Sequence, residues 1–215
     1  MVAGGSGRRF GGPKQFLELA GRPVSAWSVD GARSVADGVV LVVPVAGSGL
    51  REGAAGDPAM GADRVVEGGA TRAESVRAGL AVVPEDAEII VVHDAVRPLA
   101  SPALFAAVVD AVRSGECDGA VPVLPVADTL KRSSGGRVLA TVDRHGLVTT
   151  QTPQAFVAST LRLAHGTDAD TTDDAGLLER LGATVATVAG DTRNLKLTRP
   201  EDLQLAEALM ESTTR

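Results

Sequence analysis

The sequence predicts a single α/β domain, residues 1–215, built around a mostly parallel β-sheet. The main observation is that short β-branched runs alternate with segments of helical pattern, as in βαβ units. Two of these runs, Val39–Val43 and Glu88–Val92, are almost continuously apolar, which is typical of strands buried on both faces. With 215 residues and 44% hydrophobic content, the chain is long enough to form one full-sized core.

The first half of the chain is expected to hold short strands and helices. Met1–Ala3 is the first strand, but it is shorter than the ~5 residues of an ordinary strand, so either the start lies upstream or the strand is clipped. The capping box Thr71-Arg72-Ala73-Glu74 begins a helix, and Ser101-Pro102 begins another. The expected strands are 39–43, 65–66 and 88–92; the expected helices are 23–35, 72–83 and 102–115; residues 47–61 form a frayed helix or a loop.

The second half contains a change of pattern between Asp128 and Gln154. Polar and apolar residues alternate there around the turn Ser133–Gly136, which predicts a β-hairpin. A polar hairpin has little to pack on within its own domain, so we expect residues 127–150 to project as an arm that pairs with another subunit. Around the arm we expect strands at 120–123 and 184–188, helices at 156–165 and 173–181, an extended piece at 194–197, and a terminal helix to 212 after a second capping box, Thr198–Glu201.

The N-terminal stretch Val2–Gln15 is rich in glycine and carries Arg8, Arg9 and Lys14. Glycines let backbone N–H groups approach a ligand closely, and successive N–H groups form an anion-binding concavity. The spacing excludes a P-loop, because Pro13 and Gln15 break its pattern, and a dinucleotide fingerprint, because Phe10 replaces the third glycine. The stretch predicts a polyphosphate cradle, with a flexible surface loop as the alternative.

Composition narrows the possible partners and compartment. A net charge of −6 argues against binding of nucleic acid or anionic lipid. The single cysteine, Cys117, excludes an internal disulfide and fits a reducing cytoplasm. No apolar run approaches the ~20 residues of a membrane span, and no signal peptide precedes the loop. We therefore expect a cytoplasmic protein without a nucleic-acid or membrane partner.

Charged and small residues gather where predicted strands end, which is where ligands bind in open α/β sheets. Beside the glycine loop, these ends carry Gly68–Arg72 with Ser75, His93–Pro98 and Asn194–Lys196. Asp94 could help to hold a Mg²⁺–triphosphate, or it could be a turn cap. His93 is more simply structural, because no second histidine stands at metal-ligand spacing. The acidic run 168–174 lacks the order of a calcium loop and predicts helix capping.

Taken together, these motifs resemble a known family. In chain order they are Gly5–Arg9 with Pro13–Gln15, Gly68–Arg72 with Ser75-Val76, His93–Pro98, Asp128–Arg132, Thr141–Arg144, Gln151–Phe156, Thr172–Ala175 and Asn194–Asp202. The chain resembles 2-C-methyl-D-erythritol 4-phosphate cytidylyltransferase of the non-mevalonate isoprenoid pathway. The resemblance implies a Rossmann-like, GT-A-like nucleotidyltransferase domain that uses CTP and Mg²⁺ to convert the polyol phosphate into its CDP-alcohol and pyrophosphate.

The resemblance also assigns roles, residue by residue. Arg9 and Lys14 would stabilise charge on the α-phosphate of CTP, and Arg144 and Lys196 would act with them by positioning the polyol phosphate. The nucleotide would be held by Ala3, Gly4, Gly5, Gly7, Gly69, Ala70, Ser75 and Asp94. The second substrate would be held by Asp94, Arg97, Thr129, Arg144, Thr152 and Lys196. Mg²⁺ would be bound mainly by the CTP phosphates, with Asp94 as its one candidate protein ligand.

In this family the arm crosses to a partner, so the resemblance implies a homodimer in which Thr129, Arg144 and Thr152 serve the neighbour's site. Three positions depart from the family pattern: the first strand is short, Gly4 stands where the family has Ala, and Val148 stands where it often has Trp. Two alternatives stay open: a cytidylyltransferase for ribitol 5-phosphate, and a non-catalytic nucleotide-binding relative.

Overall fold

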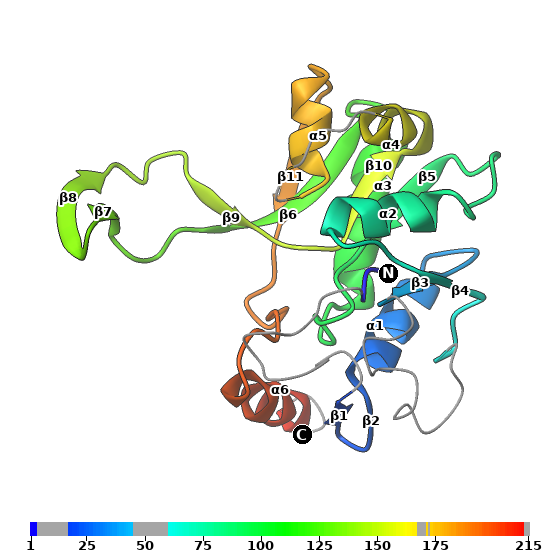
Figure 1. The fold of residues 1–215 in the computed structure, drawn as a ribbon, viewed down its shortest axis with the longest axis horizontal. Helices are drawn as coiled ribbons and strands as arrows, with labels where there is room; N and C mark the ends of the chain where they lie inside the picture. Colours follow the sequence, from blue (N-terminus) through cyan, green and yellow to red (C-terminus); the bar gives the residue numbers. More distant parts are fainter. Residues whose placement is uncertain (4–16, 45–59, 167–170, 172, 213–215) are drawn as a thin grey trace.

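The computed structural model describes residues 1–3, 17–44, 60–166, 171 and 173–212, and it is an α/β fold in which helices cover a multi-stranded sheet (Figure 1). The candidate loop at 4–16 and most of the expected loop at 47–61 lie outside these residues. The helices are α1 (Val24–Arg33), α2 (Arg72–Leu80), α3 (Pro102–Arg113), α4 (Ala158–His165), α5 (Ala175–Arg180) and α6 (Glu201–Glu211).

The largest sheet has the strand order β11-β6-β10-β5, with β9 also paired to β6. Strand β11 is parallel to β6, whereas β10 is antiparallel to both of its neighbours and β9 is antiparallel to β6. The strands concerned are β5 (Ile89–Val92), β6 (Gly119–Pro125), β9 (Val148–Thr150), β10 (Gln154–Val157) and β11 (Val185–Ala189).

Residues 1–3 join this sheet to a second, parallel pair formed by β3 (Val40–Val43) and β4 (Arg64–Glu67). Val2 forms parallel bridges with Val42 of β3 and with Asp94, which lies just beyond β5. The N–H of Val2 donates to His93 O and that of Ala3 donates to Val42 O, both at 2.8 Å. The first residues therefore lie between β3 and β5, at the centre of the combined sheet, as expected for the predicted first strand.

Most predicted elements are present, with shifted ends. The main error is at Phe156, which was expected in a helix but lies in strand β10. Its neighbour in this strand, Ala155, is paired with Val91 of β5 on one side and with Ala120 of β6 on the other. The sequence pattern also missed a small hairpin of β1 (Glu18–Leu19) and β2 (Arg22–Pro23). Residues 194–197 form no strand. For β10 and for the β1–β2 hairpin, the strand is defined by its pairing partner in the folded chain rather than by the local sequence pattern.

The two predicted capping boxes have different outcomes. At the start of α2, Thr71 accepts from Glu74 N and the Glu74 carboxylate accepts from Thr71 N, so this box is confirmed. The box predicted at Thr198–Glu201 is wrong. Asp202 is the capping side chain there, and its Oδ2 accepts from the N–H groups of Thr198 and Arg199 and from the Thr198 hydroxyl.

The hairpin predicted between 128 and 154 is formed by β7 (Leu130–Ser134) and β8 (Arg137–Val142), which pair antiparallel. Figure 1 draws these strands well away from the helices, at the far end of the segment that leaves the sheet at β6 and returns through β9. Val138 and Leu139 are 66% and 61% exposed in this single chain. The strands of the hairpin thus bury little apolar surface of their own.

Candidate functional site

Asp94 is the centre of the described site. It lies just beyond β5, and three cationic side chains approach its carboxylate, one from the same turn and two from distant segments. Lys196 Nζ lies 2.7 Å from Oδ2, Arg72 Nε lies 3.5 Å from Oδ1, and Arg97 Nε lies 3.9 Å from Oδ2. The structure therefore brings together Asp94, Arg97 and Lys196 as the sequence predicted, at the carboxyl end of a central strand.

The charges around Asp94 keep it ionised. Burial alone would raise the pKa of this carboxyl, but the positive charges of Lys196 and Arg72 outweigh burial and hold the pKa well below its usual range. The Asp94 side chain is 10% exposed, whereas that of Lys196 is 42% exposed. Lys196 is thus the member of the pair that faces solvent and can reach a ligand.

Arg72 links Asp94 to a second, fully buried carboxylate. Its Nη1 lies 2.7 Å from Oδ2 of Asp174, whose other oxygen accepts a 2.9 Å hydrogen bond from His165 Nε2. The Asp174 and His165 side chains are 1% and 2% exposed. Burial would raise the pKa of Asp174, but the bonds from His165 and Arg72 lower it. Asp94 is therefore connected through Arg72 to the buried pair of Asp174 and His165.

Arg72 and Asp174 both belong to sequence motifs that resemble the family, but neither residue was predicted to have a role at the site. The acidic run was expected to cap a helix, and Asp173 does so, since its Oδ1 accepts from Gly176 N. Asp174 stands at the cap position of α5 but makes no side-chain cap bond. No periodic signal in the sequence pairs the two residues, because Arg72 begins α2 whereas Asp174 stands at the start of α5.

A second network fixes the backbone at Asp94. The Thr152 hydroxyl accepts from Asp94 N at 3.0 Å and lies 3.1 Å from Nδ1 of His93. His93 Nε2 lies 3.2 Å from the carbonyl oxygen of Arg97 and must donate to it. Nδ1 is then the acceptor, and Thr152 donates its proton to it. Burial lowers the pKa of His93 to about 3, which keeps this ring neutral and structural.

Thr152 corrects one expectation. It was expected to serve the neighbour's site from the arm, but it is 5% exposed and bonds to His93 and Asp94 of its own chain. Its carbonyl oxygen accepts from Asn194 Nδ2 at 2.9 Å, and Arg97 Nη1 donates to Asn194 O at 2.7 Å. Asn194 thus holds the segment that carries Lys196 against the end of β5.

The Gly68-Gly69 turn brings the start of α2 to the same edge of the sheet. Gly69 N–H donates to the Ser75 hydroxyl at 3.2 Å, and Ser75 donates to Thr71 O at 2.9 Å. A Cβ on Gly69 would lie 2.3 Å from Glu74 Cβ, so glycine is required for this close approach. Ser75 is buried and Ala70 is exposed, so Ser75 shapes the turn while Ala70 borders solvent.

The other predicted nucleotide-binding residues divide into two groups. Ala3 is 3% exposed and its N–H is bonded to Val42 O, so this amide is engaged in the sheet. Gly4, Gly5, Gly7, Arg9 and Lys14 lie outside the described residues.

The arm residues stand apart from the Asp94 cluster in this single chain. Thr129 and Arg144 are exposed, and Arg144 Nη1 donates to the carbonyl oxygens of Val126 and Ala127 at the base of the arm. Within the described residues, no ion pair or hydrogen bond joins either side chain to Asp94 or Lys196.

Asp94 also decides whether the described residues fit the expected Mg²⁺. Among the residues that the structure describes, no group of three or more His, Cys, Asp or Glu side chains could form a metal cage. Mg²⁺ is commonly held by one or two carboxylates together with substrate phosphates, and Asp94 offers one ionised carboxylate at the site. The described residues therefore fit a substrate-held ion with a single protein ligand.

No helix in the described part of the chain combines the length and the apolar character that crossing a membrane requires.

Comparison with known proteins gives concordant matches along the chain. The family profile described as "IspD: 2-C-methyl-D-erythritol 4-phosphate cytidylyltransferase" matches residues 1–212. The protein of that name from Nocardia farcinica is 46% identical to this chain, and the match covers 98% of this chain and 92% of that protein. The protein of that name from Rubrobacter xylanophilus is 41% identical, and the match covers 100% of this chain and 95% of that protein. A bifunctional IspD/IspF enzyme from Nitratidesulfovibrio vulgaris is 44% identical, and the chain spans 56% of its length. The crystal structure of the cytidylyltransferase from Thermus thermophilus superposes with a TM-score of 0.82 at 36% identity, covering 98% of this chain and 96% of that one.

Proposed function

The chain belongs to the 2-C-methyl-D-erythritol 4-phosphate cytidylyltransferase family, and from this membership we propose how its residues divide the work of the reaction. It is a nucleotidyltransferase that transfers CMP from CTP to 2-C-methyl-D-erythritol 4-phosphate, and it releases pyrophosphate. A phosphate oxygen of the polyol phosphate forms a bond to the α-phosphorus of CTP while the bond to the pyrophosphate oxygen breaks. Such a transfer depends on positioning and on stabilisation of negative charge.

The observation that carries our assignment of roles is the convergence of Arg72, Arg97 and Lys196 on Asp94. Lys196 is the exposed cation of this group, so we assign it to the phosphates, together with Arg9 and Lys14 of the glycine-rich loop. Asp94, which stays ionised, accepts hydrogen bonds from substrate hydroxyls. Arg97 positions the polyol phosphate beside it.

The remaining residues act on these groups or on the nucleotide. Thr152 is a positioning residue, because its hydroxyl holds Asp94 N and its carbonyl holds Asn194. The turn at Gly69 and Ala70, shaped by Ser75, borders the nucleotide with Ala3, Gly4, Gly5 and Gly7. Mg²⁺ is held mainly by the CTP phosphates, with Asp94 as the available carboxylate, and it supplies neutralisation of phosphate charge.

We assign the fold to the Rossmann-like, GT-A-like nucleotidyltransferases, with residues 127–150 as a projecting arm. The exposed Val138 and Leu139 of the arm support a homodimer, in which Thr129 and Arg144 serve the partner's site. The net charge of −6 fits a protein without a nucleic-acid or anionic-membrane partner. Buried, unpaired Cys117 fits a reducing compartment such as the cytoplasm.

Pyrophosphate release by the purified protein tests the function. We expect CTP-dependent release with methylerythritol phosphate and little with ribitol 5-phosphate. Turnover of ribitol 5-phosphate alone would replace the substrate assignment. CTP binding without release on any polyol phosphate would instead indicate a non-catalytic relative.

A further inference from the structure

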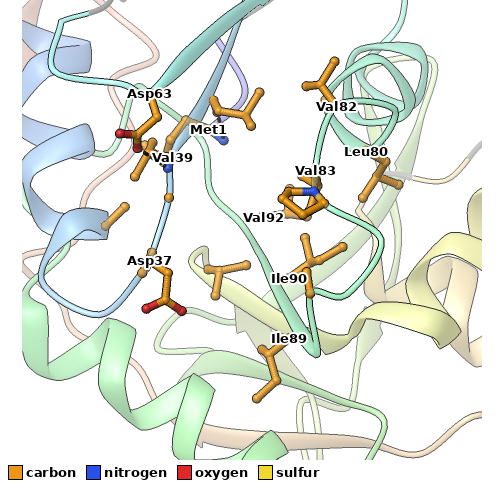
Figure 2. A pocket seen from close by; sticks show the side chains of 18 of the residues that line it. Met1, Asp37, Val39, Asp63, Leu80, Val82, Val83, Ile89, Ile90 and Val92 are labelled. Atoms are coloured by element: carbon orange, nitrogen blue, oxygen red, sulfur yellow. Dashed lines mark hydrogen bonds between the residues drawn. The ribbon is translucent and has the colours of Figure 1, made fainter.

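The position of Lys196, the exposed cation of the site, has to be explained by the contacts of its own segment. The cavity of about 660 Å³ between β3 and β5 is lined mostly by aliphatic side chains, such as those of Val39 and Ile90 in Figure 2, and neither Lys196 nor Asp94 lines it. Residues 191–196 form neither a helix nor a strand, so no ladder of backbone hydrogen bonds holds them. Their placement therefore depends on individual hydrogen bonds.

The side-chain amide of Gln151 pairs with the backbone of this segment. Its Nε2 donates to Asp191 O at 2.9 Å, and its Oε1 accepts from Asp191 N at 3.1 Å. The same Nε2 donates to Asn194 O at 3.3 Å, and the same Oε1 accepts from Asn194 Nδ2 at 3.4 Å. We call these four bonds the Gln151 clamp. One orientation of the amide satisfies all four, because its oxygen faces donors and its nitrogen faces acceptors.

The clamp is buried and closely fitted. Gln151 is 7% exposed, so little water competes for its bonds. A Cβ on Gly190 would lie 2.8 Å from Gln151 Oε1 and 2.8 Å from Val123 O, so glycine is required beside the clamp. Gly190 N donates to Val123 O at 2.9 Å, and Gln151 N donates to Pro122 O at 2.8 Å. Both sides of the clamp are therefore anchored on β6.

Lys196 lies between the clamp and a second anchor. On its carboxyl side, Leu197 N donates to Val96 O at 2.9 Å, and the Leu197 side chain is fully buried. On its amino side, only Leu195 separates Lys196 from Asn194. A shift of Asn194 is therefore passed to Lys196 over two residues. Misplacement of a charged group by 1 Å can reduce a rate on the order of 10²-fold.

We propose that Gln151 is a positioning residue for the transfer reaction, because it holds residues 191–194 so that the Lys196 ammonium stays beside Asp94 and meets the substrate phosphate. The proposal rests on the proposed function, which assigns Lys196 to the phosphates. Among the described residues, the Gln151 side chain bonds only to Asp191 and Asn194, so it acts on Lys196 through the backbone.

The proposal is tested by Gln151→Met, which keeps the length of the side chain and removes both its donor and its acceptor. We expect kcat/KM for pyrophosphate release to fall about 10–30-fold in the otherwise wild-type protein. In a Lys196→Ala background the same substitution should cost less than about threefold, because the group that it positions is already absent. Gln151→Asn, whose amide is one methylene too short for the clamp, should give the same pattern in a less perturbed core.

Gln154→Met is the matched control. Gln154 is also buried and lies three positions further along, but its amide donates to Thr150 Oγ1, Gln151 O and Asp173 Oδ2 instead of to residues 190–196. Whatever its cost, it should lower kcat/KM by the same factor, within about threefold, with and without Lys196. If the Gln151 variants also lose the same factor in both backgrounds, Gln151 contributes only to the fold and the proposal is overturned.

Hydrogen exchange tests the clamp without turnover. The Asp191 amide, which donates to Gln151 Oε1, should exchange at least about tenfold faster in Gln151→Met, while the amides of β11 keep their rates. Unchanged exchange at Asp191 would overturn the proposal. A wild-type protein that binds CTP but releases no pyrophosphate would refute the proposed function instead, and exchange at Asp191 would still show whether Gln151 holds the segment.

Discussion

Nζ of Lys196 lies 2.7 Å from Oδ2 of Asp94, although 102 positions of sequence separate the two residues. The pair joins the end of a central strand to the segment before the terminal helix. Asp94 is held in place by Arg72 and by the Thr152 hydroxyl, and Lys196 is the more exposed partner. Because Lys196 is exposed and Asp94 is held in place, a phosphate can bind to the Lys196 ammonium while a neighbouring hydroxyl donates to the Asp94 carboxylate.

Replacing Lys196 by alanine should reduce kcat/KM for pyrophosphate release by about 10²–10³-fold, because a charge aimed at a developing anion is lost. The fold should persist, since Arg72 and Arg97 still neutralise Asp94. Initial rates at varied CTP and polyol phosphate would measure the effect, with circular dichroism as the check on folding. Lys131→Ala is the matched control, because Lys131 is exposed on the arm and bonds only to Thr141 among the described contacts. Near-normal turnover in Lys196→Ala would exclude this residue from the mechanism.

Replacing Arg72 by glutamine should lower the free energy of unfolding by about 3–5 kcal/mol, because the buried Asp174 carboxylate loses its cationic partner. Urea unfolding followed by circular dichroism would measure the loss. Arg113→Gln is the control, since the Arg113–Asp110 pair is more than 60% exposed on both sides and should contribute below about 1 kcal/mol. A loss in Arg72→Gln no larger than in the control would mean that water reaches Asp174.

The sequence predicted Asp94 and Arg97 from the end of an apolar run, because such runs locate strands and strand ends locate ligands. Lys196 was predicted from an extended piece that forms no strand in the structure. It did not predict the pairing of Arg72 with Asp174, since long-range ion pairs leave no periodic signal. It missed β10 for a related reason. The strand is four residues long and runs directly into α4, so only its pairing with β5 and β6 defines it. Thr152 was misplaced because it neighbours the arm in sequence but is buried beside His93 in space.

His93 should make the protein less stable as pH falls from about 6.5 to about 3. The folded-state pKa is lowered to about 3 by burial, whereas an unfolded histidine has a pKa near ~6.5, so the unfolded chain binds the proton first. The expected slope in this window is about 1 kcal/mol per pH unit. Asp94, whose pKa is also lowered, adds a loss in the same direction below about pH 4.

His93→Gln should reduce this slope in urea unfolding measured at several pH values, whereas the exposed His145→Gln should leave it unchanged. An unaltered slope in His93→Gln would assign the acid sensitivity to other groups.

Gly69→Ala should raise the KM for CTP about tenfold or more, because the added Cβ would lie 2.3 Å from Glu74 Cβ and push the turn away from α2. The KM for the polyol phosphate should change less. Gly38→Ala is the control, because among the described residues its Cβ would meet only Asp63, at 3.9 Å. Equal KM values for CTP in the two variants would remove the turn from the nucleotide site.

The crossing of the arm can be tested by complementation between two inactive variants, Arg144→Ala and Lys196→Ala. If Arg144 serves the partner's site, each mixed dimer has one site carrying both substitutions and one site carrying neither. Mixing equal amounts under exchanging conditions should then restore activity to about a quarter of the wild-type level, since half of the dimers are mixed. If Arg144 acts within its own chain, every site keeps one substitution and mixing restores nothing. Adding Leu139→Asp to both variants should abolish the recovery, because Leu139 is 61% exposed in the single chain and a buried charge would weaken the dimer. Recovery that survives Leu139→Asp, with an unchanged sedimentation coefficient, would place the dimer contact away from β8.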